Sequence, residues 1–495
     1  MNAPEPSHHP RAAVVDLGSN SVRLVVFEGR GRNPVAIFNE KAVLRLGRGL
    51  QDSGRLNPEA VAQAAMVMRR YAAIARAMRA DPFEVLATAA VRDAENGPAF
   101  VAMLREQMPD VPIRVLAGEE EAALAAAGLV CGIPGADGVL ADIGGGSLET
   151  VRLRAGVADA AKTFRLGVIR LAERAGGEAA RARAIVEAEL AEKSWLAEGA
   201  GHDLFLVGGA WRALARIHIA ATRYPLAMVH HYTIERAAAR ELARTIASVS
   251  RRTLERMAGA PRRRLEDLPF AAVVLARLLR CTGARRVVFS ANGLREGWYL
   301  RRVATAERER DPLVASGHDY ARRFSRDPRF PAALFSWTAP LFATAPAEFR
   351  PLRELACWMS DVGIREHPEY RAEQAFLHVL RQPGVCLDHH ARAFLALALA
   401  LRYEAEPEAP FLAVAYAMLS EEAKRQAVVL GTAMRLAYTL SAGTPELLAA
   451  TSIGVEQALT LRLAVGDGVF AGESITRRMQ RLGEALGLAA TTVTV

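Results

Sequence analysis

The sequence lacks any long apolar run, although 51% of its residues are hydrophobic. A helix that crosses a membrane needs roughly 20 consecutive apolar residues, and no segment approaches that length. Residues 1–11 form a polar start that contains proline and histidine, without the apolar region of a secretion signal. We therefore expect a soluble, cytoplasmic protein that has no membrane partner and enough apolar residues for packed cores.

Cysteine is also scarce. The four cysteines, Cys131, Cys281, Cys357 and Cys386, are scattered, and no two of them form a C-x-x-C pair. This spacing excludes a disulfide framework and a thiolate zinc site. We expect each cysteine to be a buried, reduced thiol.

Aromatic residues make up only 6% of the chain, and only four of the 63 basic residues are lysines. The net charge is nevertheless +9, which favours polyanionic partners through long-range attraction. The arginine clusters at 251–252, 262–264 and 301–302 lack the interleaved aromatic side chains of a platform that stacks single-stranded nucleic acid. We interpret them as solvated helix faces and expect no nucleic-acid partner. Polyphosphate and phosphorylated nucleotides remain as candidate polyanions.

A chain of 495 residues is too long for one core and suggests about three domains. Strand and helix signals alternate up to about residue 310, and after Asp311-Pro312 the strand signals vanish. The pattern predicts two mixed α/β domains that face each other across a cleft, followed by an α-helical domain. We place the domains at 1–134, 135–310 and 311–495.

The first two domains show similar series of elements. In the first, the patterns predict strands at 12–17, 22–28, 34–46, 84–90 and 113–116, and helices at 58–79, at 97–107 and from 118. In the second, they predict a hairpin pair at 138–153, strands at 157–166, 204–207 and 286–290, and helices through 168–199, on to about 281 and at 294–301.

The most informative pattern occurs twice. Residues 14–21 read VVDLGSNS, and residues 140–147, 126 positions later, read LADIGGGS. Each copy is an apolar strand with an aspartate at its end, a tight turn of small residues, and a second strand. Such a turn presents backbone N–H groups in a concave nest that binds phosphate oxygens. The repeat predicts a duplicated unit with two phosphate loops, and the carboxylates of Asp16 and Asp142 suit a divalent cation.

Three further segments offer candidate site residues. Residues 118–124 open a helix with three consecutive carboxylates, which are rotated about 100° from one to the next, so the three cannot all face one cleft. Acids in a first turn also stabilise a helix, and one of these is a candidate general base. Residues 88–92 end a predicted strand with Arg92, whose guanidinium suits phosphate. Gly208-Gly209 and residues 290–297 are strand–glycine–helix junctions, which either bind anions or allow close packing.

Five motifs in this order make the chain resemble the exopolyphosphatase and guanosine pentaphosphate phosphatase family, within the actin, sugar-kinase and heat-shock-70 superfamily. The motifs are residues 15–21, 88–92, 118–124, 142–149 and 292–297. The resemblance covers roughly residues 10 to 310. It implies an α/β fold with two duplicated actin-like, ribonuclease-H-like domains around a cleft.

The resemblance also implies roles for single residues. Glu121 takes the position of the catalytic glutamate, and Arg92 that of an arginine that contacts phosphate. Asp16, Asp142 and Glu149 take the positions of carboxylates that organise Mg²⁺ and water, and a monovalent cation such as K⁺ is left open. The implied phosphate-binding residues are Gly18, Ser19, Asn20, Ser21, Gly144, Gly145, Gly146, Ser147, Gly208 and Gly209.

The chain departs from the family pattern in two places. Leu148 stands where threonine is usual, and Trp211-Arg212 replace a small Ser/Thr pair, so we expect Trp211 to narrow the cleft. The C-terminal part resembles, more distantly, the helical domain of metal-dependent HD phosphohydrolases. Ser360-Asp361 stands where that domain has its metal-binding His-Asp pair, although His367, His389 and His390 remain. A site without its paired ligand should hold metal poorly, so we expect this domain to lengthen a basic channel or to form the contact of a homodimer.

The predicted function is the Mg²⁺-dependent release of terminal phosphate from inorganic polyphosphate, with Glu121 activating water. Removal of the 5′ terminal phosphate of guanosine pentaphosphate is an alternative, since guanosine penta- or tetraphosphate is another fitting polyanion. A third hypothesis is a non-catalytic sensor that binds polyphosphate or alarmone. The set of Glu121, Arg92, Asp16 and Asp142 speaks against it, and Glu121 also speaks against a kinase.

Overall fold

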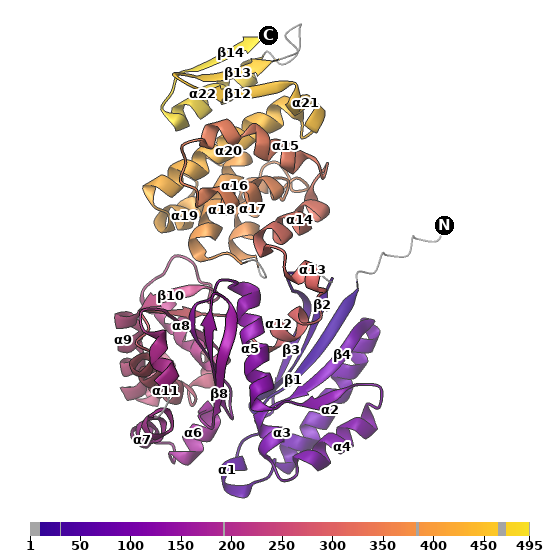
Figure 1. Cartoon of the computed structure of the whole chain (residues 1–495), viewed down its shortest axis with the longest axis vertical. Helices are drawn as coiled ribbons and strands as arrows, with labels where there is room; N and C mark the ends of the chain where they lie inside the picture. Colours follow the sequence, from indigo (N-terminus) through magenta and orange to yellow (C-terminus); the bar gives the residue numbers. More distant parts are fainter. Residues whose placement is uncertain (1–9, 30, 192–193, 383–385, 464–471, 495) are drawn as a thin grey trace. The chain divides into compact units, whose positions relative to one another are not determined.

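The computed structural model describes residues 10–29, 31–191, 194–382, 386–463 and 472–494 (Figure 1). The chain divides into two compact units, Met1–Glu309 and Arg310–Val495. The candidate site residues all lie in the first of these units. None of the four cysteines forms a disulfide within the described residues, as predicted, but only Cys131 and Cys357 are fully buried.

The first unit begins with a five-stranded sheet in the order β3-β2-β1-β4-β5. The strands β1, β2 and β3 are antiparallel neighbours, and β1 runs parallel to β4, which runs parallel to β5. The bounds are β1 (Arg11–Leu17), β2 (Ser21–Glu28), β3 (Val35–Val43), β4 (Ala80–Ala87) and β5 (Ile113–Val115).

A second sheet in the same unit repeats this arrangement. Its order is β10-β11-β9-β6-β7-β8, so β6, β7, β8, β9 and β11 correspond to β1, β2, β3, β4 and β5 with the same relative directions. Even the irregularity recurs, between Val26 and Phe27 and between Arg152 and Leu153. The predicted duplication is therefore confirmed. The bounds are β6 (Gly138–Ile143), β7 (Leu148–Arg154), β8 (Val157–Phe164), β9 (Asp203–Val207), β10 (Tyr232–Glu235) and β11 (Arg286–Phe289).

The edge strand β10 was not predicted. It has only four residues, of which Tyr232 and Ile234 are buried, and it pairs with β11 alone. A strand this short between two helices carries too little alternation to be distinguished from a loop.

Helices cover the two sheets. Near β1, α2 begins at Pro58 because Asn57 caps it, accepting hydrogen bonds from the backbone N–H groups of Glu59 and Ala60. The helices are α1 (Leu50–Ser53), α2 (Pro58–Ala77), α3 (Ala89–Asp93), α4 (Gly97–Gln107), α5 (Gly118–Gly132), α6 (Val168–Arg174), α7 (Ala179–Leu190), α8 (Gly209–Ala221), α9 (Arg236–Ser248), α10 (Arg251–Arg256), α11 (Leu268–Thr282), α12 (Leu294–Leu300) and α13 (Thr305–Arg308). Short 3-10 turns lie at Ser194–Gly199 and Arg262–Arg264.

The helices α5 and α12 pack side by side, close to backbone contact (Figure 1). A Cβ atom at Gly297 would lie 1.9 Å from the Leu124 carbonyl oxygen, and one at Gly128 would lie 1.8 Å from the Gly293 carbonyl oxygen. Only glycine fits at these two crossings. This packing holds the N-terminal ends of α5 and α12, which carry candidate site residues, in one fixed arrangement.

The second unit is helical over residues 312–449, as predicted. Its helices are α14 (Pro312–Phe324), α15 (Phe330–Trp337), α16 (Phe349–Trp358), α17 (Arg371–Arg381), α18 (His389–Arg402), α19 (Ala413–Met418), α20 (Glu421–Ser441), α21 (Pro445–Ala449) and α22 (Glu473–Leu486), with 3-10 turns at Ala339–Phe342 and Pro410–Leu412.

The prediction that strands vanish after residue 312 was wrong for the end of the chain. A three-stranded sheet in the order β12-β13-β14 is formed by Thr451–Val455, Leu459–Leu463 and Ala490–Thr494. In β13 the buried residues Leu459, Leu461 and Leu463 alternate with less buried ones, a period of two that is typical of a strand. The signal was present but short, beside much longer helical patterns.

Candidate active site

The two predicted phosphate loops have the same hydrogen-bonded turn. The backbone N–H of Gly18 donates to the Ser21 carbonyl oxygen over 3.1 Å, and that of Gly144 donates to the Ser147 carbonyl oxygen over 2.9 Å. Each loop joins the central strand of its sheet to the next antiparallel strand, β1 to β2 and β6 to β7. The repeated sequence pattern thus corresponds to a repeated backbone geometry.

The two loops lie against each other. A Cβ atom at Gly146 would lie 2.8 Å from the Ser19 hydroxyl oxygen, and one at Gly145 would lie 3.0 Å from Ser19 Cβ. Real Cβ atoms are rarely this close to other atoms, so the approach of the loops depends on the missing side chains. The backbone of both loops therefore borders one shared space.

That space is a cavity of about 150 Å³. It is lined by most of the predicted site residues: Asp16, Gly18, Ser19, Asn20, Ser21, Glu121, Asp142, Gly144, Gly145, Gly146, Ser147, Glu149, Gly208 and Gly209. Arg92 does not line the cavity and reaches it through Glu121. The tertiary structure thus brings predicted residues from four separate segments to the cavity, with Arg92 from a fifth beside Glu121.

Four carboxylates meet at this cavity, and burial is the main cause that raises the pKa of each. The pKa of Glu121 is raised to about 7, because burial and the charges of Asp142 and Asp16 outweigh the opposing Arg92. Burial raises the pKa of Asp142 to about 6 and also raises that of Asp16. The pKa of Glu149 is raised by burial and then by the charge of Glu121. Clustered carboxylates with raised pKa values are typical of acid–base and metal sites.

Arg92 lies in a short helix and not at the end of the predicted strand. The strand expected at 84–90 ends at Ala87, and Thr88 precedes the short helix α3, which carries Arg92. Its Nη1 donates to Glu121 Oε2 over 3.1 Å and to the Leu116 carbonyl oxygen over 2.9 Å. The guanidinium thus binds the candidate base directly.

Basic side chains that were not predicted as site residues line the rest of the cavity. They are Arg23, Lys41, Arg212, Arg264 and Arg295. Arg295 is only 8% exposed and has no hydrogen-bond or ion-pair partner among the described residues. Its position within the motif at 292–297 was the available signal. Arg264, interpreted as part of a solvated cluster, instead lines the cavity and pairs with Asp267 over 3.2 Å.

Trp211 does not narrow the cleft, contrary to the expectation. Its side chain is fully buried in the core of the second lobe, the part of the first unit that is built on the second sheet, and its Nε1 donates to the Ala271 carbonyl oxygen over 3.2 Å. The adjacent Arg212 faces the cavity instead. Burial and the nearby charges of Arg295 and Arg23 lower the pKa of Arg212 to about 10. Consecutive helical residues point in different directions, so the substitution places a cation, not an indole ring, at the cavity.

The two repeats differ where their strands pair. Asp16 lies opposite Arg23 in the β1–β2 ladder, whereas Asp142 lies opposite Glu149 in the β6–β7 ladder. Directly opposed residues share one face of a sheet. The first lobe therefore adds a cation to the cavity at the register position where the second lobe adds a carboxylate.

The donor set suits a hard cation that keeps much of its water. Among the described residues, no three or more His, Cys, Asp or Glu side chains form a group that could hold a metal ion by themselves. Mg²⁺ usually binds one or two carboxylates, with water and substrate phosphates completing its shell. One Glu149 oxygen, Oε1, is buried without a hydrogen-bond partner in the part of the chain that the structure describes. The carboxylates of Asp16, Asp142 and Glu149 are hard oxygen donors, of which such an ion would use one or two.

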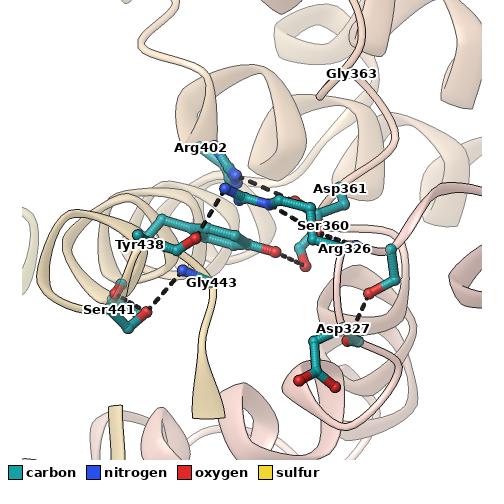
Figure 2. Close-up of polar contacts among 12 residues, drawn as sticks. Arg326, Asp327, Ser360, Asp361, Gly363, Arg402, Tyr438, Ser441 and Gly443 are labelled. Carbon is teal, nitrogen blue, oxygen red and sulfur yellow. Dashed lines mark hydrogen bonds and ion pairs between the residues drawn. The ribbon is translucent and has the colours of Figure 1, made fainter. Parts of the chain in front are cut away.

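The second unit has an ion-paired cluster around Asp361 (Figure 2). Asp361 is 3% exposed, accepts from Arg326 Nη2 over 3.0 Å and lies 3.6 Å from Arg402 Nη2. The Arg402 guanidinium lies 3.6 Å from the centre of the Tyr438 ring. Ser360 Oγ and the Tyr438 hydroxyl are 2.8 Å apart.

The remaining histidines are not gathered at this cluster as a metal site. His389 is buried, whereas His367 and His390 are exposed, and within the described ranges no metal-binding group occurs. Arginine side chains therefore neutralise Asp361. Among the described residues, no helix is long and apolar enough to cross a membrane.

Comparisons with known proteins agree with this architecture. Exopolyphosphatase 2 of Mycobacterium tuberculosis is 35% identical over 174 residues, which cover 33% of this chain and 54% of the relative. This chain thus spans about half the length of that relative. Exopolyphosphatase 1 of the same organism is 29% identical over 316 residues, which cover 59% of this chain and 88% of the relative.

Two solved structures share the fold of the first unit. An exopolyphosphatase from Cytophaga hutchinsonii matches with a TM-score of 0.54 and 20% identity, over 59% of this chain and 97% of that one. The Aquifex aeolicus member of the Ppx/GppA family matches with a TM-score of 0.51 and 21% identity, over 61% of this chain and 99% of that one.

Family models cover both units. Residues 313–493 match the model of the exopolyphosphatase C-terminal domain. Residues 25–306, more than half of the chain, match the model of the Ppx/GppA phosphatase family. Since this match covers more than half of the chain, the chain belongs to the Ppx/GppA phosphatase family.

Proposed function

We propose that this protein is an exopolyphosphatase that hydrolyses the terminal phosphate of inorganic polyphosphate. The observation that carries the proposal is the position of Glu121: a buried carboxylate with a pKa raised to about 7, at a cavity bordered by two phosphate-type loops. The relatives named exopolyphosphatases support the choice of substrate.

In this proposal, the two loops bind the terminal phosphoryl group. Both loops border the cavity, and backbone N–H groups other than those of Gly18 and Gly144, which close the two turns, would hold the phosphate oxygens as charge develops on them. Glu121 would accept a proton from the attacking water, and Arg92 would fix the carboxylate through its hydrogen bond. Phosphoryl transfer depends mainly on positioning and electrostatics, so the loops and Arg92 matter as much as the base.

Asp16, Asp142 and Glu149 are the proposed Mg²⁺ ligands. When bound, the ion would neutralise phosphate charge and orient water. Without it, burial and then the charge of Asp16 raise the pKa of Asp142, and burial and then the charges of Glu121 and Asp142 raise that of Glu149. A monovalent cation such as K⁺ stays a prediction, as do cytoplasmic location and the homodimer.

The cations of the cavity are the proposed binding groups for the following phosphates of the chain. Arg23, Arg212 and Arg295 lie within electrostatic reach of one another, and such mutual repulsion is relieved by a polyanion. A substrate with consecutive phosphates supplies this negative charge again after each phosphate is released.

Guanosine pentaphosphate is the second candidate substrate. Its 5′ phosphates fit the same loops, but no phenylalanine, tyrosine, tryptophan or histidine is among the described residues that line the cavity. A guanine base would lack a ring to stack on. This observation favours polyphosphate over the nucleotide.

The test measures phosphate release from long-chain polyphosphate and from guanosine pentaphosphate, side by side, with Mg²⁺. We expect polyphosphate to be preferred, and we expect Glu121→Gln to lose about 10²–10⁴-fold in turnover while still binding polyphosphate. Preference for the nucleotide would make the protein an alarmone phosphatase. Binding without release from either substrate would support the sensor hypothesis, and unchanged turnover in the variant would remove Glu121 from the mechanism.

A further inference from the structure

We propose that Arg170 is a positioning residue for Glu121, acting across the cleft through Asp93 and Arg92. The inference rests on the proposed hydrolytic role of Glu121. Arg170 belongs to α6, which follows the second sheet, whereas Asp93 and Arg92 belong to α3, which follows β4 of the first sheet.

The four side chains form a chain of alternating charge. Arg170 Nη2 donates to Asp93 Oδ2 over 2.7 Å, and Arg92 Nε donates to Asp93 Oδ1 over 3.3 Å. Arg92 Nη1 then donates to Glu121 Oε2 over 3.1 Å. Each charge therefore contacts an opposite one, and the last is the candidate base.

This chain is shielded from solvent. The side chain of Arg170 is 8% exposed, that of Asp93 20%, and that of Glu121 12%. Charges interact more strongly there than at an exposed surface, where such pairs contribute little. The geometry of Arg92 is therefore defined from both sides, by Asp93 and by Glu121.

The helix that carries Arg170 is built onto the second phosphate loop. The backbone N–H groups of Ile169 and Arg170 both donate to the Gly145 carbonyl oxygen, over 3.0 and 3.1 Å. A Cβ atom at Gly167 would lie 2.3 Å from the Ser147 backbone nitrogen, so the helix start and the loop are in direct contact. A displacement of this loop is thus transmitted to Arg170.

A second contact ties α6 to the first loop. Glu173 Oε1 accepts from the Gly49 backbone N–H over 2.7 Å, and the nearby Gly47 N–H donates to the Ser19 carbonyl oxygen over 2.8 Å. The same short helix therefore contacts the second loop, the segment that supports the first loop, and the chain of charges that ends at Glu121. The helix α6 therefore fixes the position of Glu121 relative to both loops, at one distance between the two lobes.

Arg170, Asp93 and Arg92 do not line the cavity. Loss of Arg170 should therefore affect the position of the base and leave the phosphate-binding groups in place. Misplacement of a reacting group by about 1 Å can cost about 10²-fold in rate. We expect Arg170→Gln to lower kcat by about 10- to 100-fold, with KM for polyphosphate changed less than about threefold.

The control is Arg174→Gln. Arg174 lies one turn further along the same helix and pairs with Glu189, within the second lobe. This variant should keep the wild-type kcat and KM. Arg170→Lys, which keeps a cation, should recover part of the lost kcat.

The test compares these variants with Asp93→Asn and with the double variant, and follows folding by thermal unfolding and substrate affinity by polyphosphate binding. We expect the double variant to be no slower than the slower single variant, because both substitutions break one chain. Equal kcat values for Arg170→Gln and Arg174→Gln, additive losses, or a loss confined to KM would overturn the positioning role. If the wild type releases phosphate from neither substrate, the proposed function itself fails. If the wild type is active and the variants keep its kcat, only the positioning role is refuted.

Discussion

Arg92 and Glu121 form a hydrogen-bonded ion pair between α3 and the first turn of α5, with 3.1 Å between Nη1 and Oε2. Burial and neighbouring carboxylates favour the neutral acid, while the guanidinium favours the carboxylate, and the balance puts the pKa of Glu121 at about 7. A base is most effective when its pKa lies near the working pH. The pair therefore both orients Glu121 and tunes it.

This balance predicts the pH dependence of the reaction. Glu121 must be deprotonated to accept a proton, so kcat/KM should rise with pH through about 7 and level off above it. Arg92 lowers the pKa of Glu121, so Arg92→Gln should move this rise to higher pH and reduce activity at pH 7 more than at pH 8.5. The measurement is kcat/KM from pH 5.5 to 9 at saturating Mg²⁺. A rise with an unchanged midpoint in the variant would contradict the assignment.

We expect Glu149 to lower the free energy of unfolding of the metal-free protein, a cost that its proposed role in metal binding would explain. Its side chain is 1% exposed, one oxygen lacks a partner, and its pKa is raised by burial and by Glu121. The folded state therefore holds a proton that the unfolded state releases above about pH 4.5, so this contribution to stability falls as pH rises. Glu149→Gln should stabilise the metal-free protein by about 1–3 kcal/mol at pH 7.5 while reducing activity.

Thermal unfolding without metal checks this prediction, and the wild type supplies its own control. At pH 5 Glu149 is protonated in the folded state, so the difference between wild type and variant should shrink there. A variant that unfolds at the same or a lower temperature at pH 7.5 would show that Glu149 is already compensated.

Arg295 is predicted to serve binding and not folding. It is only 8% exposed, and it has no hydrogen-bond or ion-pair partner within the described part of the chain. A hydrogen bond to a charged group contributes about 1.5–3 kcal/mol, so Arg295→Met should raise KM for polyphosphate about 10- to 100-fold without lowering the unfolding temperature.

The matched control is Arg301→Met, at the exposed end of the same helix. It should leave KM unchanged. Steady-state kinetics over a range of polyphosphate concentrations separates KM from kcat. A fall in unfolding temperature with an unaltered KM would assign Arg295 to structure.

Asp361 is predicted to stabilise the second unit. Arg402 is 2% exposed and would stay buried without its counter-ion in Asp361→Asn. Removing one partner of a buried ion pair costs about 3–5 kcal/mol, so calorimetry of the full chain should show a lower unfolding temperature. The control, Asp327→Asn, breaks a pair with the exposed Arg329 and should cost no more than about 1 kcal/mol. Equal effects would mean that the cluster is open to solvent.

The local patterns predicted much of the fold and of the site. The helix predicted near 97–107 is α4, Gly97–Gln107, and the repeated turns lie where the repeat placed them. These features depend on neighbours in sequence: turn residues, capping, and the alternation of apolar residues. Trp211 and Arg264 were misjudged because their environments come from distant segments, α11 for the indole ring and the two loops for the guanidinium.

The sequence by itself predicted a duplicated α/β arrangement with two loops of phosphate-binding type, Asp16 and Asp142 at the ends of the repeated strands, and a helical segment after them, whereas the family resemblance selected Glu121. Those properties depend on short-range turn chemistry and on periodicity. Only the tertiary structure decided which cations face the cavity, that Arg92 holds Glu121, and that Arg170 reaches across to Asp93. Such contacts join residues 29 and 77 positions apart, and their distances depend on how sheets and helices pack, which no local pattern specifies.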